Sequence, residues 1–176
     1  MIIRSMALGA GLAALLCGGT ALAQAPTPPA NPLDNIPEAM PFNVPYGAPI
    51  TAEQARAVIA AGVAEAKKRN WALIFTVLDS GGNLVAFERM DGAQIGSIPI
   101  SQKKALAAVQ LRRETKLLEA AIQAGNNYLL SIDQIIGSRG GIPLVLDGKI
   151  IGSIGVSGGT GSQDEVAAKA GVAALK

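Results

Sequence analysis

The sequence contains no histidine among its 176 residues. This absence excludes a Ser-His-Asp triad and a histidine-ligated zinc site. The single cysteine, Cys17, lies in an N-terminal apolar stretch that we expect to be removed. The mature chain would then have no thiolate nucleophile and no disulfide, so packing alone must stabilise it. Any acid–base catalyst must therefore be a carboxylate, a lysine, a tyrosine or water.

Aromatic residues and excess charge are also scarce. Aromatic residues make up 3% of the chain, and the formal net charge is +2. With no run of basic residues, nothing in the sequence favours binding to nucleic acid. Few aromatic side chains and alanine-rich helices predict a modest core for a chain of this length. We therefore expect a homo-oligomer, a dimer or larger, in which small-residue helix faces such as 105–108 pair with each other.

The first 23 residues have the pattern of a secretory signal peptide. Arg4 provides the charged start, residues 6–16 form an apolar run, and Ala21-Leu22-Ala23 is a typical cleavage site. The apolar run is shorter than the roughly 20 residues that span a membrane. The pattern predicts cleavage near Ala23, no stable membrane insertion, and a periplasmic or secreted protein.

Residues 24–50 form a proline-rich arm, which holds eight of the ten prolines. Proline fixes φ and lacks a backbone donor, so this segment is predicted to be extended and not part of the core. Phe42, Val44 and Tyr46 alternate near its end. This alternation suggests docking on the domain or on a neighbouring subunit, and the other interpretation is a loose linker. The globular domain is predicted to cover 51–176.

The best-specified local structure lies between residues 140 and 165, which read GGIPLVLDGKIIGSIGVSGGTGSQDE. Asp147-Gly148 separates two apolar runs and suits a type I′ turn, which needs positive φ at both central residues. Both faces of this hairpin are mostly apolar, so we expect layers on both sides. The glycine-rich loop 155–161 lacks the lysine of a phosphate-binding loop and is interpreted as a tight connection. Ser162 and Glu165 are predicted to form a capping box for the last helix.

The rest of the domain alternates helices with one more hairpin. Thr51 and Gln54 form a capping box for a helix that is predicted to end near Asn70. A hairpin follows over 71–90, then a helix over 98–113 with Ser101 as a candidate N-cap, and a helix that Thr115 caps. The last helix is expected to bury Val166, Ala170, Ala173 and Ala174. Two hairpins among helices predict an α+β fold, an antiparallel sheet with helices packed on it.

Two polar clusters are candidates for chemistry. Glu88, Arg89, Met90 and Asp91 follow one another at the end of a strand. They form either the solvent-exposed side of an edge strand or the rim of a pocket. In the second case, Arg89 or Asp91 would bind a polar group of the ligand. Basic pairs at 103–104 and 112–113 bracket one helix, and most of these cations are expected to be solvated.

The hairpin and loop at 140–165, together with the segment 89–93, resemble the GlcG/HbpS family of haem-binding or haem-degrading-type domains. The resemblance covers roughly residues 50–176 and implies a profilin-like fold with a sheet of about five strands. It also implies oligomers, a ligand site near 88–91 and a small-molecule ligand, haem. We therefore take the candidate ligand-binding residues to be Glu88, Met90, Ala107, Arg112 and Thr115.

The sequence departs from the family pattern at the implied haem site. The family commonly has a KAxTA pattern, whose threonine can face haem, whereas this chain has Ala107 at that position. No metal ligand is assigned, since Met90, Lys104 and Tyr128 are equal candidates for an iron ligand. We expect weak haem binding without strong low-spin character, and a gain from Ala107→Thr or Ala107→His.

Two other functions stay open. One is a cofactor-independent lyase or isomerase that acts on a small hydroxy- or oxo-acid, with Asp91, Lys104 and Arg89 as its catalytic residues. The other is an oligomeric structural module that supports a periplasmic partner.

Overall fold

The structure, a computed structural model, describes residues 38–175, and its compact unit begins at Ala39. The predicted signal peptide and residues 24–37 of the arm lie outside the described residues. In chain order the elements are α1 (Ala52–Lys68), β1 (Ile74–Asp79), β2 (Leu84–Arg89), α2 (Ser97–Leu111), α3 (Thr115–Gln123), the 3₁₀ helix η2 (Asn127–Ser131), β3 (Gly141–Leu146), β4 (Lys149–Ser157) and α4 (Gly161–Ala173).

The strands form one antiparallel sheet in the order β2-β1-β4-β3. This confirms the predicted α+β class and both hairpins. Asp147 and Gly148 have φ values of 50° and 72°, as a type I′ turn requires. The expected sheet of about five strands is slightly off, because within residues 38–175 the sheet has four.

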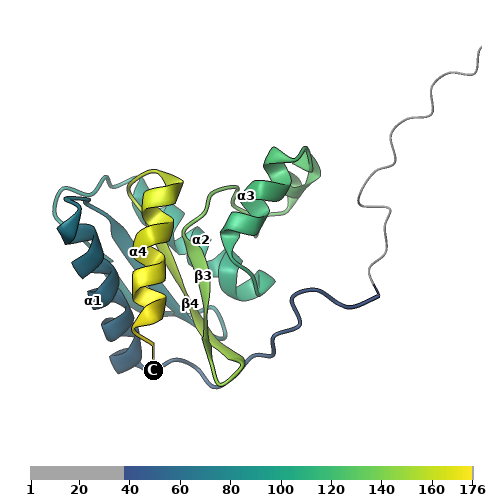
Figure 1. Cartoon of the computed structure of the whole chain (residues 1–176), viewed down its shortest axis with the longest axis horizontal. Helices are drawn as coiled ribbons and strands as arrows, with labels where there is room; N and C mark the ends of the chain where they lie inside the picture. The colour runs from purple at the N-terminus through teal and green to yellow at the C-terminus, as the bar shows by residue number, and fades with distance from the viewer. Residues whose placement is uncertain (1–37, 176) are drawn as a thin grey trace, which may run out of the picture. The chain divides into compact units, whose positions relative to one another are not determined.

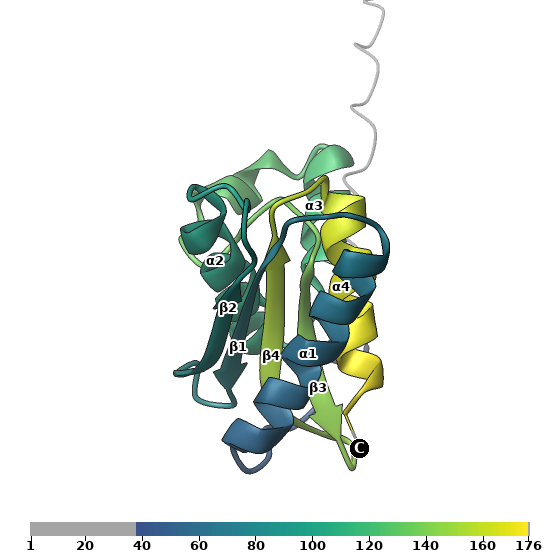
Figure 2. The same ribbon diagram turned by 90° about the vertical axis from the view of Figure 1, so that its left-hand side faces the viewer.

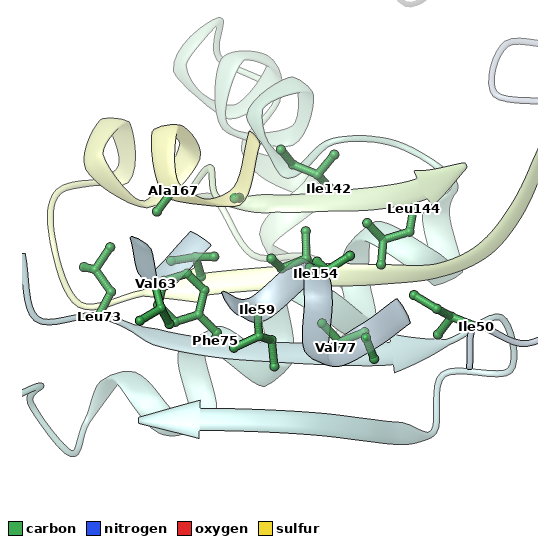
Figure 3. Packing of buried hydrophobic residues seen from close by; sticks show 14 of the residues in the cluster. Ile50, Ile59, Val63, Leu73, Phe75, Val77, Ile142, Leu144, Ile154 and Ala167 are labelled. Carbon is green, nitrogen blue, oxygen red and sulfur yellow. The ribbon is translucent and has the colours of Figure 1, made fainter. Parts of the chain in front are cut away.

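Helices cover both faces of the sheet (Figures 1 and 2). α1 and α4 lie side by side on one face, and α2 packs against β1, β3 and β4 on the other. The largest apolar cluster lies beneath α1 and α4, with Phe75 and Ile154 at its centre (Figure 3). The predicted capping box of α1, formed by Thr51 and Gln54, is confirmed. The six residues buried on α1 are Ala55, Val58, Ile59, Gly62, Val63 and Ala66.

Glycines allow α2 to approach the sheet very closely. A Cβ added to Gly155 of β4 would lie 2.1 Å from the carbonyl oxygen of Ser101, and one on Gly141 would lie 2.3 Å from that of Lys104. Hydroxyl groups link the layers at the same place, since Ser153 Oγ donates to the carbonyl of Ala105 at 2.7 Å. Ala105, like its neighbours at 107 and 108, is fully buried. The expected pairing of these alanines with a second copy is therefore wrong, because they pack inside the protomer.

Three other local expectations are corrected. The N-cap of α4 is Thr160 with Gln163 at N3, not Ser162 with Glu165. Ser101 lies inside α2 rather than at its start, and its Oγ contacts Ile98 O and Thr76 Oγ1, each at 2.9 Å. The buried face of α4 differs from the predicted one. It consists of Asp164, Glu165, Ala167, Ala168 and Gly171.

The end of the arm docks on the domain. The backbone N–H of Gly47 donates to Ile150 O and that of Ile150 to Pro45 O, both at 2.8 Å. The Tyr46 hydroxyl donates to the carbonyl of Val109 at 2.9 Å, near the end of α2. Residues 45–50 therefore extend the sheet beside β4 as a single bridge, not as a fifth strand.

We predict that Gly155→Ala lowers the free energy of unfolding by about 1–3 kcal/mol, because a methyl group at this position meets the backbone of α2. Gly96→Ala is the matched control, since no heavy atom lies within 4 Å of its added Cβ. The control should change stability by less than about 0.5 kcal/mol. Urea denaturation measures both variants, and equal midpoints would contradict the close packing of α2 on β4.

Candidate ligand sites

An apolar groove opens between the β1–β2 turn and α2. Its volume is about 380 Å³, within the range of about 300–1,000 Å³ that is usual for small-molecule sites. Leu78 at the end of β1, Leu84 at the start of β2 and Leu106 on α2 form its apolar walls. The other lining residues are Gly82, Gln102, Lys103, Asp133 and Gln134.

The groove exists because α2 does not cover the whole sheet. The register pairs Leu78 with Leu84 after a shift that skips Val85 of β2, so both side chains lie on the face that α2 partly covers. α2 packs against β1, β3 and β4, and Leu84 on the edge strand stays 57% exposed. Among the described residues that line the groove, Lys103 is the one cation and Asp133 the one carboxylate. The groove therefore suits an apolar ligand, and a carboxylate on that ligand has a partner only at Lys103.

A second hollow, of charged character, lies at the end of β2. It measures about 380 Å³ and is lined by Lys67, Glu88, Arg89, Met90 and Asp91. The Met90 sulfur accepts a hydrogen bond from the Leu73 N–H at 3.5 Å. This contact turns the thioether inward, toward Leu73 and the main apolar cluster. Glu88, Arg89 and Asp91 thus line one hollow, although Glu88 and Arg89 leave the strand on opposite faces.

Lys104 is separated from this charged hollow by its burial. Its side chain is 1% exposed and its Nζ lies 2.7 Å from Asp164 Oδ2, which is 2% exposed. Nζ also donates to the Val156 carbonyl at 3.1 Å, and the Gly159 N–H donates to Asp164 Oδ1 at 3.0 Å. Burial raises the pKa of Asp164 above its ordinary value, although the Lys104 ammonium acts in the opposite direction. Lys104 is not among the residues that line the hollow with Asp91.

The other candidate residues also have structural partners. Ala107 is fully buried in an apolar cluster with Leu118 and Ile135, so a histidine there would overpack the cluster. Thr115 Oγ1 accepts a hydrogen bond from the Gly141 N–H at 3.0 Å. Arg112 ends α2 in the left-handed conformation, with φ of 52°, and its guanidinium lies 5.7 Å from the centre of the Tyr46 ring. In this structure none of the three lines the groove or the charged hollow.

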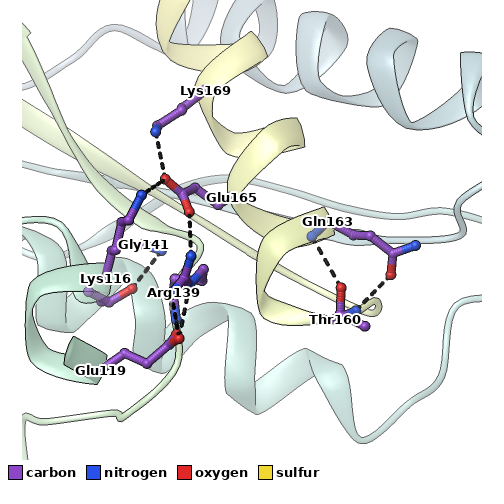
Figure 4. Close-up of polar contacts among 9 residues, drawn as sticks. Lys116, Glu119, Arg139, Gly141, Thr160, Gln163, Glu165 and Lys169 are labelled. Carbon is purple, nitrogen blue, oxygen red and sulfur yellow. Dashed lines mark hydrogen bonds and ion pairs between the residues drawn. The ribbon is translucent and has the colours of Figure 1, made fainter. Parts of the chain in front are cut away.

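A polar network fixes α3 and the start of β3 to α4 (Figure 4). Glu165 accepts hydrogen bonds from Lys116, Lys169 and Arg139. Arg139 also pairs with Glu119 at 2.8 Å. Burial opposes ionisation of Glu165, but the hydrogen bonds from Lys169 and Lys116 outweigh it and lower its pKa. The hydrogen bond from Arg139 likewise lowers the pKa of Glu119. Glu119 and Glu165 therefore both stay ionised at a lower pH than an ordinary glutamate does.

A four-stranded antiparallel sheet with helices on both faces, and with hollows of ligand size on its surface, defines a small α+β domain. A family model for the haem degrading protein HbpS-like family matches residues 50–173. The chain belongs to the HbpS-like family.

Individual relatives agree with this assignment. Protein GlcG of Escherichia coli K12 is 44% identical over 108 residues, which cover 61% of this chain and 81% of GlcG. Among solved structures, Klebsiella pneumoniae ORFY has a TM-score of 0.69 and 32% identity, covering 80% of this chain and 97% of its own. A complex of PduOC with haem has a TM-score of 0.67 and 26% identity, covering 73% of this chain and 96% of its own. No helix in residues 38–175 combines the length and apolarity that crossing a membrane needs.

We predict that Asp164→Ala destabilises the fold by about 3–5 kcal/mol, because it leaves the Lys104 ammonium buried without its counter-ion. The double variant Lys104→Met/Asp164→Leu should recover most of this loss, since it removes both charges. Arg69→Met is the control, because it breaks an exposed pair with Glu65 and should cost less than about 1 kcal/mol. Chemical denaturation of the variants measures these differences, and an Asp164→Ala variant as stable as the control would contradict this role.

Proposed function

We propose that this protein binds haem in the apolar groove between the β1–β2 turn and α2. The observation that carries the proposal is the composition of the groove, which has three leucine walls and two charged lining residues, Lys103 and Asp133. A porphyrin presents an apolar ring to such walls, and its propionates suit a lysine ammonium. Membership of the HbpS-like family and the likeness to a haem-bound PduOC support the same ligand.

The chemistry of the groove fits haem only in part. Iron in haem proteins is usually held by histidine, cysteine, methionine or tyrosine. None of these residue types lines the groove, and the chain has no histidine. Met90 is turned inward toward Leu73, and Lys104 is held by Asp164. We therefore propose that apolar contact and propionate pairing carry the affinity, which gives weak binding and a spectrum without strong low-spin character.

A haemin titration followed by visible absorption tests this proposal. Lys103→Glu should weaken binding by about tenfold or more, because it places a carboxylate beside the propionates. Leu84→Asp should weaken it similarly by charging the apolar wall. Arg56→Glu makes the same charge change as Lys103→Glu on the exposed side of α1 and should leave the affinity unchanged. Wild-type binding that neither groove variant weakens would place the haem elsewhere, and no absorption change at all would overturn haem binding.

We also propose that the chain is exported and that it self-associates. The proposal of export depends on the signal-peptide pattern of residues 1–23 and predicts a mature protein that begins at Gln24. Intact-mass measurement of exported material checks this cleavage site, and a full-length chain recovered with membranes would contradict it. Self-association depends on apolar side chains that the fold leaves exposed outside the groove, among them Phe87 on the edge strand and Ile95 in the segment that follows it.

A further inference from the structure

The charged hollow at the end of β2 has the features of a second ligand site. Lys67 comes from the last turn of α1, Glu88 and Arg89 from the end of β2, and Asp91 from the turn that follows. This turn is held by backbone hydrogen bonds from Met90 N to Leu73 O and from Ala93 N to Met90 O, both at 3.1 Å. The inward-turned Met90 lies against the main apolar cluster and gives the hollow a fixed apolar base.

The charges around this hollow do not pair with each other. Glu88 lies opposite Phe75, on the side of α1, whereas Arg89 lies opposite Ile74 on the other side of the sheet. Successive strand residues point to opposite faces, so the hollow surrounds the end of the edge strand and these two side chains are kept apart. Within residues 38–175, the ion pairs and side-chain hydrogen bonds do not include Lys67, Glu88, Arg89 or Asp91.

By contrast, other charged residues at the end of α1 do form ion pairs. Lys68 and Arg69 both pair with Glu65, at 3.6 Å and 2.7 Å. Charged residues at the end of α1 therefore find partners where the geometry allows it. Around the hollow the fold instead places two cations and two carboxylates where a ligand can reach both signs.

We propose that this hollow binds a small zwitterion of the α-amino acid class. Its carboxylate would meet Arg89, and its ammonium would meet Asp91, two residues further along the chain. We choose this class of ligand because two cationic and two anionic side chains line the hollow. An anion alone would be attracted by the two cations but repelled by the two carboxylates, and the reverse holds for a cation. A ligand with both charges has each one matched. This site is independent of the apolar groove and does not depend on haem binding.

Amide chemical shifts of the full chain test the proposal, with L-alanine, L-serine and L-glutamine as probes. At least one of them should shift the amides of residues 67 and 88–92 with a dissociation constant of about 1 mM or tighter. Propionate and ethylamine each carry one of the two charges of L-alanine and should bind at least about tenfold more weakly. Loss of this discrimination would overturn the zwitterion assignment.

Two variants locate the site. Arg89→Gln and Asp91→Asn should each weaken binding of the responding amino acid by about tenfold or more. Arg56→Gln removes an exposed arginine from the same helix as Lys67, outside the hollow, and should leave binding unchanged. Because all these side chains are on the surface, the variants should retain the wild-type melting temperature. If none of the three amino acids shifts the amides of the hollow, its charges are only solvated and the proposal fails.

Discussion

The buried ion pair of Lys104 and Asp164 is the interaction on which the arrangement of layers depends. Lys104 comes from α2 on one face of the sheet, and Asp164 comes from α4, which packs on the other. The ion pair lies near the end of β4, where the Val156 carbonyl accepts a hydrogen bond from Lys104 Nζ. Two charges removed from water must stay together, because either one alone would be strongly unfavourable. The pair therefore fixes the start of α4 relative to α2, and with it the loop after β4.

The same interaction explains which features could be predicted from the sequence. Turn chemistry and apolar alternation depend on neighbouring residues, and they correctly gave the Asp147-Gly148 hairpin and the α1 capping box. The start of α4 contains two overlapping capping patterns, Thr160 with Gln163 and Ser162 with Glu165. The structure uses the first, because Asp164 and Glu165 are turned inward to basic partners from other elements. No local pattern carries that information.

The two candidate sites also differ in how far the sequence alone could predict them. The charged hollow uses consecutive residues around Arg89, so a dense polar cluster in the sequence indicated it. The groove combines residues from 78 to 134, and only Lys103 within a basic pair gave a signal for it. Lys103 and Lys104 are adjacent and chemically identical, yet the first lines the groove and the second is buried. A helix turns by about 100° per residue, so only the position of α2 on the sheet separates their roles.

The docked end of the arm has a mechanical consequence. Residues 45–50 are hydrogen-bonded to β4, and the Arg113 guanidinium lies 3.5 Å from the centre of the Phe42 ring. Force applied to the N-terminal side of the chain would reach these contacts before it reached α1. A load from whatever precedes the arm would therefore first peel this short segment from β4. Because Val44 packs in the same apolar cluster as Leu78 and Leu106, peeling would loosen two walls of the apolar groove before it affected the charged hollow.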